Sequence, residues 1–454
     1  MVPHPPIIVA EVGHGEEQKI CKTIAAYEEV GREIAELQPE TIIVSSPHNV
    51  MYYDYFNISS GETAAGDFAQ FRAPEVKMKY PYDTELVQNI CGLAKDNNLA
   101  AGTLGQKDPA LDHGTMVPLY FIRKYYNNFK LVRIGLSGQP LSEHYRFGQL
   151  IQQAVEQTGR RAVYVASGDL SHKYSLESSY GFNPAGPEYD RRIMDVMGRG
   201  AFGELFEFDE SFCQKAAECG HRSFVIMAGV LDQTGVEAKA LSHEGPWGIG
   251  YGVCTYRVTG PDSSRNFLQQ WEEKEQTRLA ARKAAENPYV SLARYTVESY
   301  VKEHTIPSVP KGLPEEMISS KGGVFVSLHE EGQLRGCIGT TGPTTPCIAE
   351  EIIQNAVSAA SRDPRFSPVR PQELDKLEYS VDVLGKPEPV ESTRDLDIKQ
   401  YGVIVSNGSR HGLLLPDLDG VDSVEQQVAI ARKKADIGPY EDFDLQRFTV
   451  TRHS

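Results

Sequence analysis

The chain has 454 residues, of which 40% are hydrophobic and 24% charged, and its formal net charge at pH 7 is −16. This acidic balance argues against nonspecific binding to nucleic acid or to anionic membranes, which attract basic surfaces. No apolar stretch approaches the ~20 residues of a membrane-spanning helix, and the N-terminal sequence lacks the features of a signal peptide. We therefore expect a cytoplasmic protein of two or three domains.

The cysteines point to a reducing compartment. There are seven of them, an odd number, and none forms a C-x-x-C pair. Neither a disulfide framework nor a structural zinc site is therefore expected.

Helices and strands alternate through residues 1–258. An apolar face at helical spacing predicts a helix over residues 16–38, ended by Pro39. Continuous apolar strands that alternate with helices indicate an α/β domain with a mostly parallel sheet and helices on both faces. Short apolar runs predict its strands over residues 41–44, 130–136, 162–166 and 238–241.

The pattern changes after residue 258. Residues 259–287 are rich in Glu, Lys, Gln and Arg, which predicts a charged linker helix. Residues 288–454 mix strands and helices without βαβ order, which favours a smaller α+β domain. Its predicted helices cover residues 288–300, 348–361 and 424–435, and its predicted strands cover 324–328, 334–339, 379–384 and 402–405.

Polar side chains follow three predicted strands of the first domain. They are His48, His172 and Glu244. Because ligands of open parallel sheets bind outside the carboxyl ends of the strands, we expect these side chains to meet at one edge. His4, near the start of the chain, and His113, in L-D-H-G, complete the set. Imidazoles and a carboxylate gathered in this way can hold a divalent metal, as in the two-histidine, one-carboxylate sites of non-haem Fe(II) oxygenases.

The prediction of a metal site depends on the whole set of residues. A single histidine at a strand end is more commonly a loop residue that forms hydrogen bonds. A histidine of the set that does not bind the metal can move protons, since its pKa lies near working pH. Only three residues precede His4, so we expect it to be the least firmly held member.

The first domain resembles the class III extradiol ring-cleavage dioxygenases of the catalytic-subunit-B type. The MEMO-like proteins belong to the same superfamily. The resemblance covers roughly residues 1–258 and is carried by an ordered set of motifs. These are P-H-P-P-I-I-V-A-E-V-G, S-S-P-H-N, L-D-H-G-T-M-V-P-L, S-G-D-L-S-H-K and H-E-G-P-W-G-I-G-Y.

This resemblance implies a set of roles. His4, His48 and Glu244 would ligate Fe(II), with zinc as the alternative metal. His172 would act as acid and base, and His113 would contact the substrate or oxygen. The substrate would be a small aromatic diol whose ring opens beside the two hydroxyls.

Two other functions stay open. MEMO-like relatives share the scaffold without a clear ring-cleaving role, and fold does not determine reaction. The second hypothesis is therefore a MEMO-like metal-binding module that acts as a subunit alongside a radical-SAM enzyme. A hydrolase that uses zinc in the same ligands is the third. The sequence leaves the oligomeric state open, and a homo-oligomer is compatible with it.

The second domain resembles the AMMECR-type domain over most of residues 288–454. The motifs are L-R-G-C-I-G, R-D-P-R-F-S-P-V and H-G-L-L-L-P. The whole chain is similar to the two-part family called AmmeMemoRadiSam system protein A, which implies a radical-SAM protein as partner. Arg335 and Cys337 share one face of a predicted strand. Cys337 is interpreted as a buried core residue, a catalytic thiol or part of a binding surface.

Overall fold

A computed structural model describes residues 1–105, 110–418 and 420–454. The chain separates into two compact units, Met1–Glu273 and Lys274–Ser454, and the boundary falls within helix α9 (Phe267–Ala285). The predicted linker over residues 259–287 contains this helix. Among the described residues, no helix has the length and apolar character needed to cross a membrane.

A parallel sheet lies at the centre of the first unit. Its strands are β1 (Thr41–Ser46), β6 (Lys130–Gly135) and β7 (Ala162–Ala166), in the order β6-β1-β7. Both neighbours run parallel to β1. The prediction of an α/β fold with a parallel sheet is therefore confirmed for these three strands.

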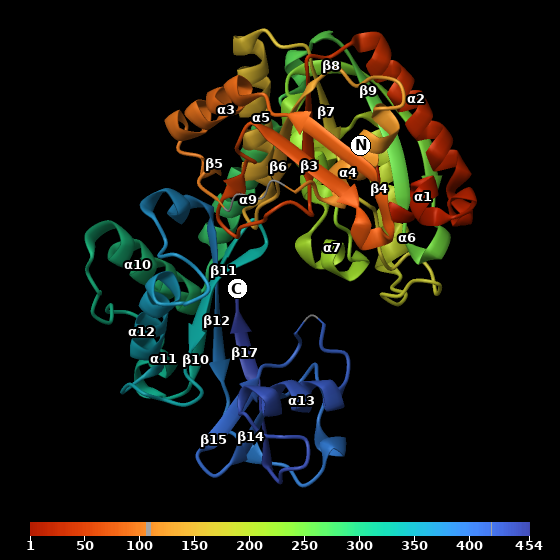
Figure 1. The fold of residues 1–454 in the computed structure, drawn as a ribbon. Coiled ribbons are helices and arrows are strands. Elements are labelled where there is room, and N and C mark those ends of the chain that lie inside the picture. Colours follow the sequence, from red (N-terminus) through yellow and green to blue (C-terminus); the bar gives the residue numbers. More distant parts are fainter. Residues whose placement is uncertain (106–109, 419) are drawn as a thin grey trace. The chain divides into compact units, whose positions relative to one another are not determined.

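Helices of the first unit cover this sheet, and sheets of two strands flank it (Figure 1). The helices before α9 are α1 (Ala10–Gly13), α2 (Cys21–Leu37), α3 (Thr84–Asp96), α4 (His113–Ile122), α5 (Leu141–Thr158), α6 (Ala185–Arg199), α7 (Glu210–Ala216) and α8 (His221–Val230). The other strands are β2 (Phe56–Asn57), β3 (Thr63–Phe68), β4 (Ala73–Pro81), β5 (Ala101–Gly102), β8 (Thr234–Glu244) and β9 (Tyr251–Pro261).

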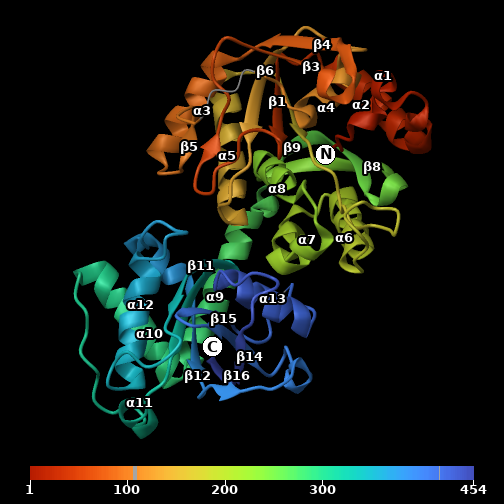
Figure 2. The ribbon, with the colours of Figure 1, turned by 60° about the horizontal axis from the view of Figure 1, so that its bottom comes forward.

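Alternate residues of β1 belong to two different hydrophobic clusters. Ile42 and Val44 pack with side chains of α2 and α4, whereas Ile43 packs with side chains of α3 and α5. Because successive side chains of a strand point to opposite faces, these two clusters are the two faces of the sheet. Figure 2 shows the same arrangement, with α3 and α5 on one side of β1 and β6 and with α2 and α4 on the other.

The strand predicted over residues 238–241 does not pair directly with β1, β6 or β7. It is part of β8, which pairs antiparallel with β9. A short apolar run indicates a strand but carries no information about its partner. Cys254 of β9 exchanges two backbone hydrogen bonds of 3.0 Å with Met1, and Val2 pairs with Ser167, so the first residues of the chain join this ladder to the edge of the parallel sheet.

Antiparallel sheets build the second unit, whose helices are α10 (Pro288–Glu303), α11 (Glu315–Ser319), α12 (Ile348–Ser361) and α13 (Val424–Lys434). The order β11-β10-β12-β17 joins strands Gln333–Gly339, Val324–Glu330, Leu377–Leu384 and Val450–His453. The order β13-β16-β14-β15 joins Glu388–Pro389, Asp444–Phe448, Gly402–Asn407 and Arg410–Leu414. Helices α10 and α12 share a core with the first sheet, and α13 shares one with the second.

Two glycines let α5 and α8 touch backbone to backbone. A Cβ atom on Gly229 of α8 would lie 2.0 Å from the carbonyl oxygen of Tyr145, and one on Gly148 of α5 would lie 2.1 Å from that of Ile226. Helices approach this closely only where small residues remove the side chain between them. The crossing determines where α8 and the turn before it lie.

We expect Gly229→Ala to lower the free energy of unfolding of the first unit by roughly 1–3 kcal/mol, the usual cost of overpacking. Gly92→Ala is the matched control, because Gly92 lies in α3 with open space around its missing Cβ. That change should raise stability by about 0.5–1 kcal/mol. Urea unfolding followed by tryptophan fluorescence measures both, since Trp247 and Trp271, the two tryptophans, belong to the first unit. Equal stability of the two variants would contradict the close crossing.

Candidate metal centre

The parallel pairing of β1 with β7 brings two loops of the first unit to one edge of the sheet. In the register of the two strands, Ser45 lies opposite Ala166. The loop after β1 carries His48, and the loop after β7 carries Asp169 and His172. The two loops therefore meet at the carboxyl ends of their strands, as the sequence predicts.

His4 is firmly held, contrary to the expectation from its position near the start of the chain. Val2 forms a parallel bridge to Ser167, beside the end of β7. The Val2 amide donates to the Ala166 carbonyl at 2.9 Å, and the Gly168 amide donates to the Val2 carbonyl at 3.0 Å. The amide of His4 itself donates to Asp169 Oδ1 at 2.7 Å. Strand pairing thus positions a side chain that is only 1% exposed.

Three ligand atoms converge beside this edge. His4 Nε2 lies 3.1 Å from His48 Nε2 and 3.6 Å from the sulfur of Cys219. The ligand atoms of these three residues all lie within 4.8 Å of one another. His113 is adjacent, with its ring centroid 3.9 Å from that of His48 and 5.6 Å from that of His4. The structure therefore brings three predicted histidines together and adds a thiol.

Cys219 reaches the centre through a close contact between two turns. It lies between α7 and α8 and precedes Gly220. A Cβ atom on Gly168, in the loop after β7, would lie 2.1 Å from the Cα atom of Gly220. The Asp169 amide donates to the Cys219 sulfur at 3.3 Å. Sequence reasoning missed this residue because it follows a helix rather than a strand, and the glycine beside it is only a weak signal.

A second group of three ligand atoms consists of those of Asp169, His172 and Cys219. Asp169 Oδ2 lies 3.9 Å from His4 Nε2 and 4.0 Å from His172 Nε2. His172 Nδ1 lies 2.5 Å from the carbonyl oxygen of Ala217. Because a carbonyl only accepts, Nδ1 carries a proton, and Nε2 is the nitrogen on the side of Asp169. His172 therefore lies close to the centre, on the side of Asp169 and Cys219.

Glu244 lies in neither group of described residues. Its Oε2 atom accepts hydrogen bonds from Thr23 N at 2.7 Å and Thr23 Oγ1 at 2.9 Å, near the start of α2. Glu244 ends β8, which pairs with β9. The Asp169 carboxylate lies 3.9 Å from His4 Nε2, and the charges of Asp112 and Asp169 both act on His48.

The L-D-H-G motif joins the loop of His48 to α4. Asp112 caps α4 by accepting from Thr115 N at 3.0 Å, and it accepts from Ser46 Oγ at 2.6 Å. Ser46 Oγ in turn accepts from His48 N at 3.1 Å. A Cβ atom on Gly114 would lie 2.3 Å from Ser46 Oγ, so the close approach requires glycine there.

Burial keeps the imidazoles of the centre neutral. Burial first, and then the neighbouring His48, lowers the pKa of His4 to about 3. Burial, with the other two histidines, lowers the pKa of His113 to about 4, and burial lowers the pKa of His48. Burial also raises the pKa of the Cys219 thiol. Neutral imidazoles and a thiol that converge out of water are a donor set that fits a transition metal, because the ion compensates for their lost solvation.

Comparison with known proteins agrees with this geometry. Residues 1–254 match the family described as the catalytic LigB subunit of aromatic ring-opening dioxygenase, and residues 290–453 match the family AMMECR1. The first match covers more than half of the chain. The chain belongs to the LigB family. It carries an AMMECR1 region after the LigB region.

Similar proteins match the whole chain or one part of it. A protein of Clostridium acetobutylicum is 42% identical over an alignment of 461 positions, which spans 100% of this chain and 98% of that protein. A protein of Thermotoga maritima is 49% identical over 170 residues, 37% of this chain and 98% of that protein. The crystal structure of an uncharacterised protein from Pyrococcus horikoshii is 35% identical, with a TM-score of 0.34, and covers 36% of this chain and 88% of its own.

In the AMMECR1 region, Arg335 and Cys337 do not interact with each other. Arg335 forms a two-pronged ion pair with Glu373, with Nε 2.7 Å and Nη2 3.2 Å from its carboxylate oxygens. The Cys337 sulfur accepts from Ser327 Oγ at 3.2 Å, and burial raises the pKa of the thiol. The carboxylate of Asp363 accepts a hydrogen bond from the Cys337 amide at 2.9 Å, and its charge also raises the pKa of the thiol. A half-buried thiol that stays protonated is a poor nucleophile. This geometry favours a packing role for Cys337.

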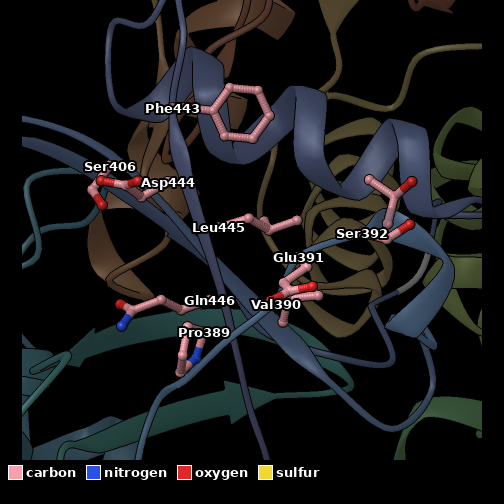
Figure 3. Close-up of a pocket in the computed structure, with 10 residues that line it drawn as sticks. Pro389, Val390, Glu391, Ser392, Ser406, Phe443, Asp444, Leu445 and Gln446 are labelled. Atoms are coloured by element: carbon pink, nitrogen blue, oxygen red, sulfur yellow. The ribbon is translucent and has the colours of Figure 1, made fainter.

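A cavity of about 550 Å³ lies elsewhere in the AMMECR1 region (Figure 3). Phe443 and Leu445 line it together with the carboxylates of Glu391 and Asp444. Neither histidine nor cysteine is among the described residues that line it, and Arg335 is not among them. We assign no chemistry to this cavity.

We expect Cys337 to react with iodoacetamide at pH 7.5 more slowly than the exposed Cys21, because its raised pKa lowers the thiolate fraction and its partial burial limits access of the reagent. Labelling should become faster as the pH rises towards 9, since the thiolate fraction grows. Mass spectrometry of the alkylated peptides measures both rates, and unfolding in urea should make them equal. Faster labelling of Cys337 than of Cys21 would restore the catalytic interpretation.

Proposed function

We propose that the LigB region is a metal-dependent oxidoreductase that holds Fe(II) with His4, His48 and Cys219. The observation that carries this proposal is the convergence of two imidazole nitrogens 3.1 Å apart with a thiol 3.6 Å away. Cys219 takes the place that the sequence alone assigns to Glu244. Three protein ligands leave coordination positions open, which an enzyme needs and a structural site does not.

An Fe(II) ion in this site would supply redox chemistry towards oxygen and a small aromatic diol. The protein's own residues would then handle substrate and protons. His113, neutral at pH 7 and beside His48, is placed to contact a bound substrate. His172 is placed to accept a proton at Nε2, because Nδ1 is held by the Ala217 carbonyl.

The thiol supports a second candidate from a different class. Sulfur ligands favour Cu(I) and zinc, whereas the Fe(II) sites of non-haem oxygenases consist of two histidines and a carboxylate. On this proposal the LigB region is a metal-binding module without ring-cleaving activity, and the chain is a subunit that serves a radical-SAM enzyme. Zinc in the same ligands could also activate water for hydrolysis.

We expect anaerobically prepared protein to bind about one Fe(II) per chain, since the three ligands describe one site. Cys219→Ala and His48→Ala should each weaken binding by more than about 100-fold, beyond the usual effect of residues outside the ligand set. Glu244→Gln should bind the metal as the wild type does, because its carboxylate faces Thr23. Metal analysis and competition with a chromophoric chelator measure these affinities. Loss of metal in Glu244→Gln with retention in Cys219→Ala would reverse the assignment.

Oxygen consumption over a panel of catechols separates the two candidate functions. The enzyme proposal expects uptake of oxygen with the appearance of a ring-opened product, and His172→Ala should lower the rate by about 100–10,000-fold, the usual contribution of a general acid or base. Metal content serves as the control, since His172→Ala should keep its iron. A metal-loaded wild type that consumes no oxygen, but co-purifies with a radical-SAM enzyme, would favour the module.

A further inference from the structure

Ser167 links a metal ligand to the helix that carries His113. It directly follows β7, and its side chain is fully buried. Its Oγ atom lies 2.9 Å from His4 Nδ1 and 2.5 Å from the carbonyl oxygen of Gly114, in α4. One hydroxyl therefore bridges the imidazole of His4 and the backbone of the residue after His113.

The protons of this chain of hydrogen bonds can be assigned from the chemistry of its members. The Gly114 carbonyl has no proton, so the single hydroxyl proton of Ser167 must point to it. The hydroxyl then has only lone pairs left for His4, so His4 Nδ1 must be protonated and donate. A neutral imidazole carries one proton, which leaves His4 Nε2 with a free lone pair.

The same reasoning extends to His48. His4 Nε2 and His48 Nε2 lie 3.1 Å apart, at hydrogen-bond distance. Since His4 Nε2 is an acceptor, it can receive a hydrogen bond from His48 Nε2 or from the thiol of Cys219, whose sulfur lies 3.6 Å away, when no metal is present. His4 holds Nε2 ready to bind a metal in either case, because its proton stays on Nδ1.

We propose that Ser167 is a positioning residue that commits His4 to bind metal through Nε2, with the proton of His4 held on Nδ1 before and after the metal binds. The proposal rests on the proposed metal centre and deepens it. Outer hydrogen-bond partners of histidine ligands generally determine tautomer and ring orientation in this way. Ser167 touches neither the metal nor a substrate, and it acts only through His4.

Nitrogen-15 NMR of histidine-labelled, perdeuterated full-length protein tests the tautomers directly. In metal-free protein at pH 7, we expect His4 to be protonated at Nδ1, with its signals assigned by their loss in His4→Gln. Addition of Zn²⁺, a diamagnetic probe, should leave the proton of His4 on Nδ1 and shift the signal of its Nε2 atom, which binds the ion. A His4 proton on Nε2 in the metal-free protein would overturn the proposal.

Affinity for the metal alone provides the second test. Ser167→Ala should weaken Zn²⁺ and Fe(II) binding by about 10–100-fold, and Ser167→Thr, which keeps the hydroxyl, should restore it. The matched control is Ser223→Ala, which removes another buried hydroxyl, bonded to Ser45 Oγ at 2.6 Å. That variant should bind metal as the wild type does.

The outcomes separate this inference from the proposed function. A wild type that binds metal, with Ser167→Ala binding equally tightly, refutes the role of Ser167 and leaves the metal centre intact. A wild type that binds no metal refutes the centre itself. If Ser167→Ala fails to fold by circular dichroism, the tautomers of the wild type still decide, since that measurement needs no change at Ser167.

Discussion

The parallel pairing of β1 with β7 is the constraint on which the LigB region depends. It places the loops after the two strands, which carry His48 and Asp169, at one edge of the sheet. The chain segment of Val2 adds to the same edge by bridging Ser167, and so brings His4 beside them. A shift of one residue in this pairing would turn the side chains that follow to the opposite face.

Close backbone contacts between glycines position the part of the centre that strand pairing does not reach. The contact of Gly168 with Gly220 determines where Cys219 lies, and the crossing of α5 with α8 determines where Gly220 lies. The centre is therefore built from rigid elements and not from side chains that adapt to one another. Such pre-organisation keeps neutral imidazoles and a thiol close together, although each loses hydration by burial.

Much of this arrangement follows from the sequence, because strands that are buried on both faces leave a clear apolar signal. For that reason the sequence predicts the strands β1, β6 and β7. It also predicts the histidines that follow β1 and β7. The partner of β8 was not predictable, since an apolar run does not specify which strand it joins, and the role of Glu244 as a ligand stays a prediction. Cys219 and the ion pair of Arg335 with Glu373 depend on contacts between distant segments, for which a single sequence holds no direct signal.

The separation of the ligands along the chain has a consequence for the order of events during synthesis. His4 and His48 are 44 residues apart, and His4 and Cys219 are 215 apart. A nascent chain that has emerged as far as β7 holds both histidines but lacks the thiol, so no complete site forms on it. Long-range contacts of this kind form late, after the cost of closing the loops between them has been met. On the proposed function, metal loading would therefore follow the folding of the LigB region, because the three ligands come together only then.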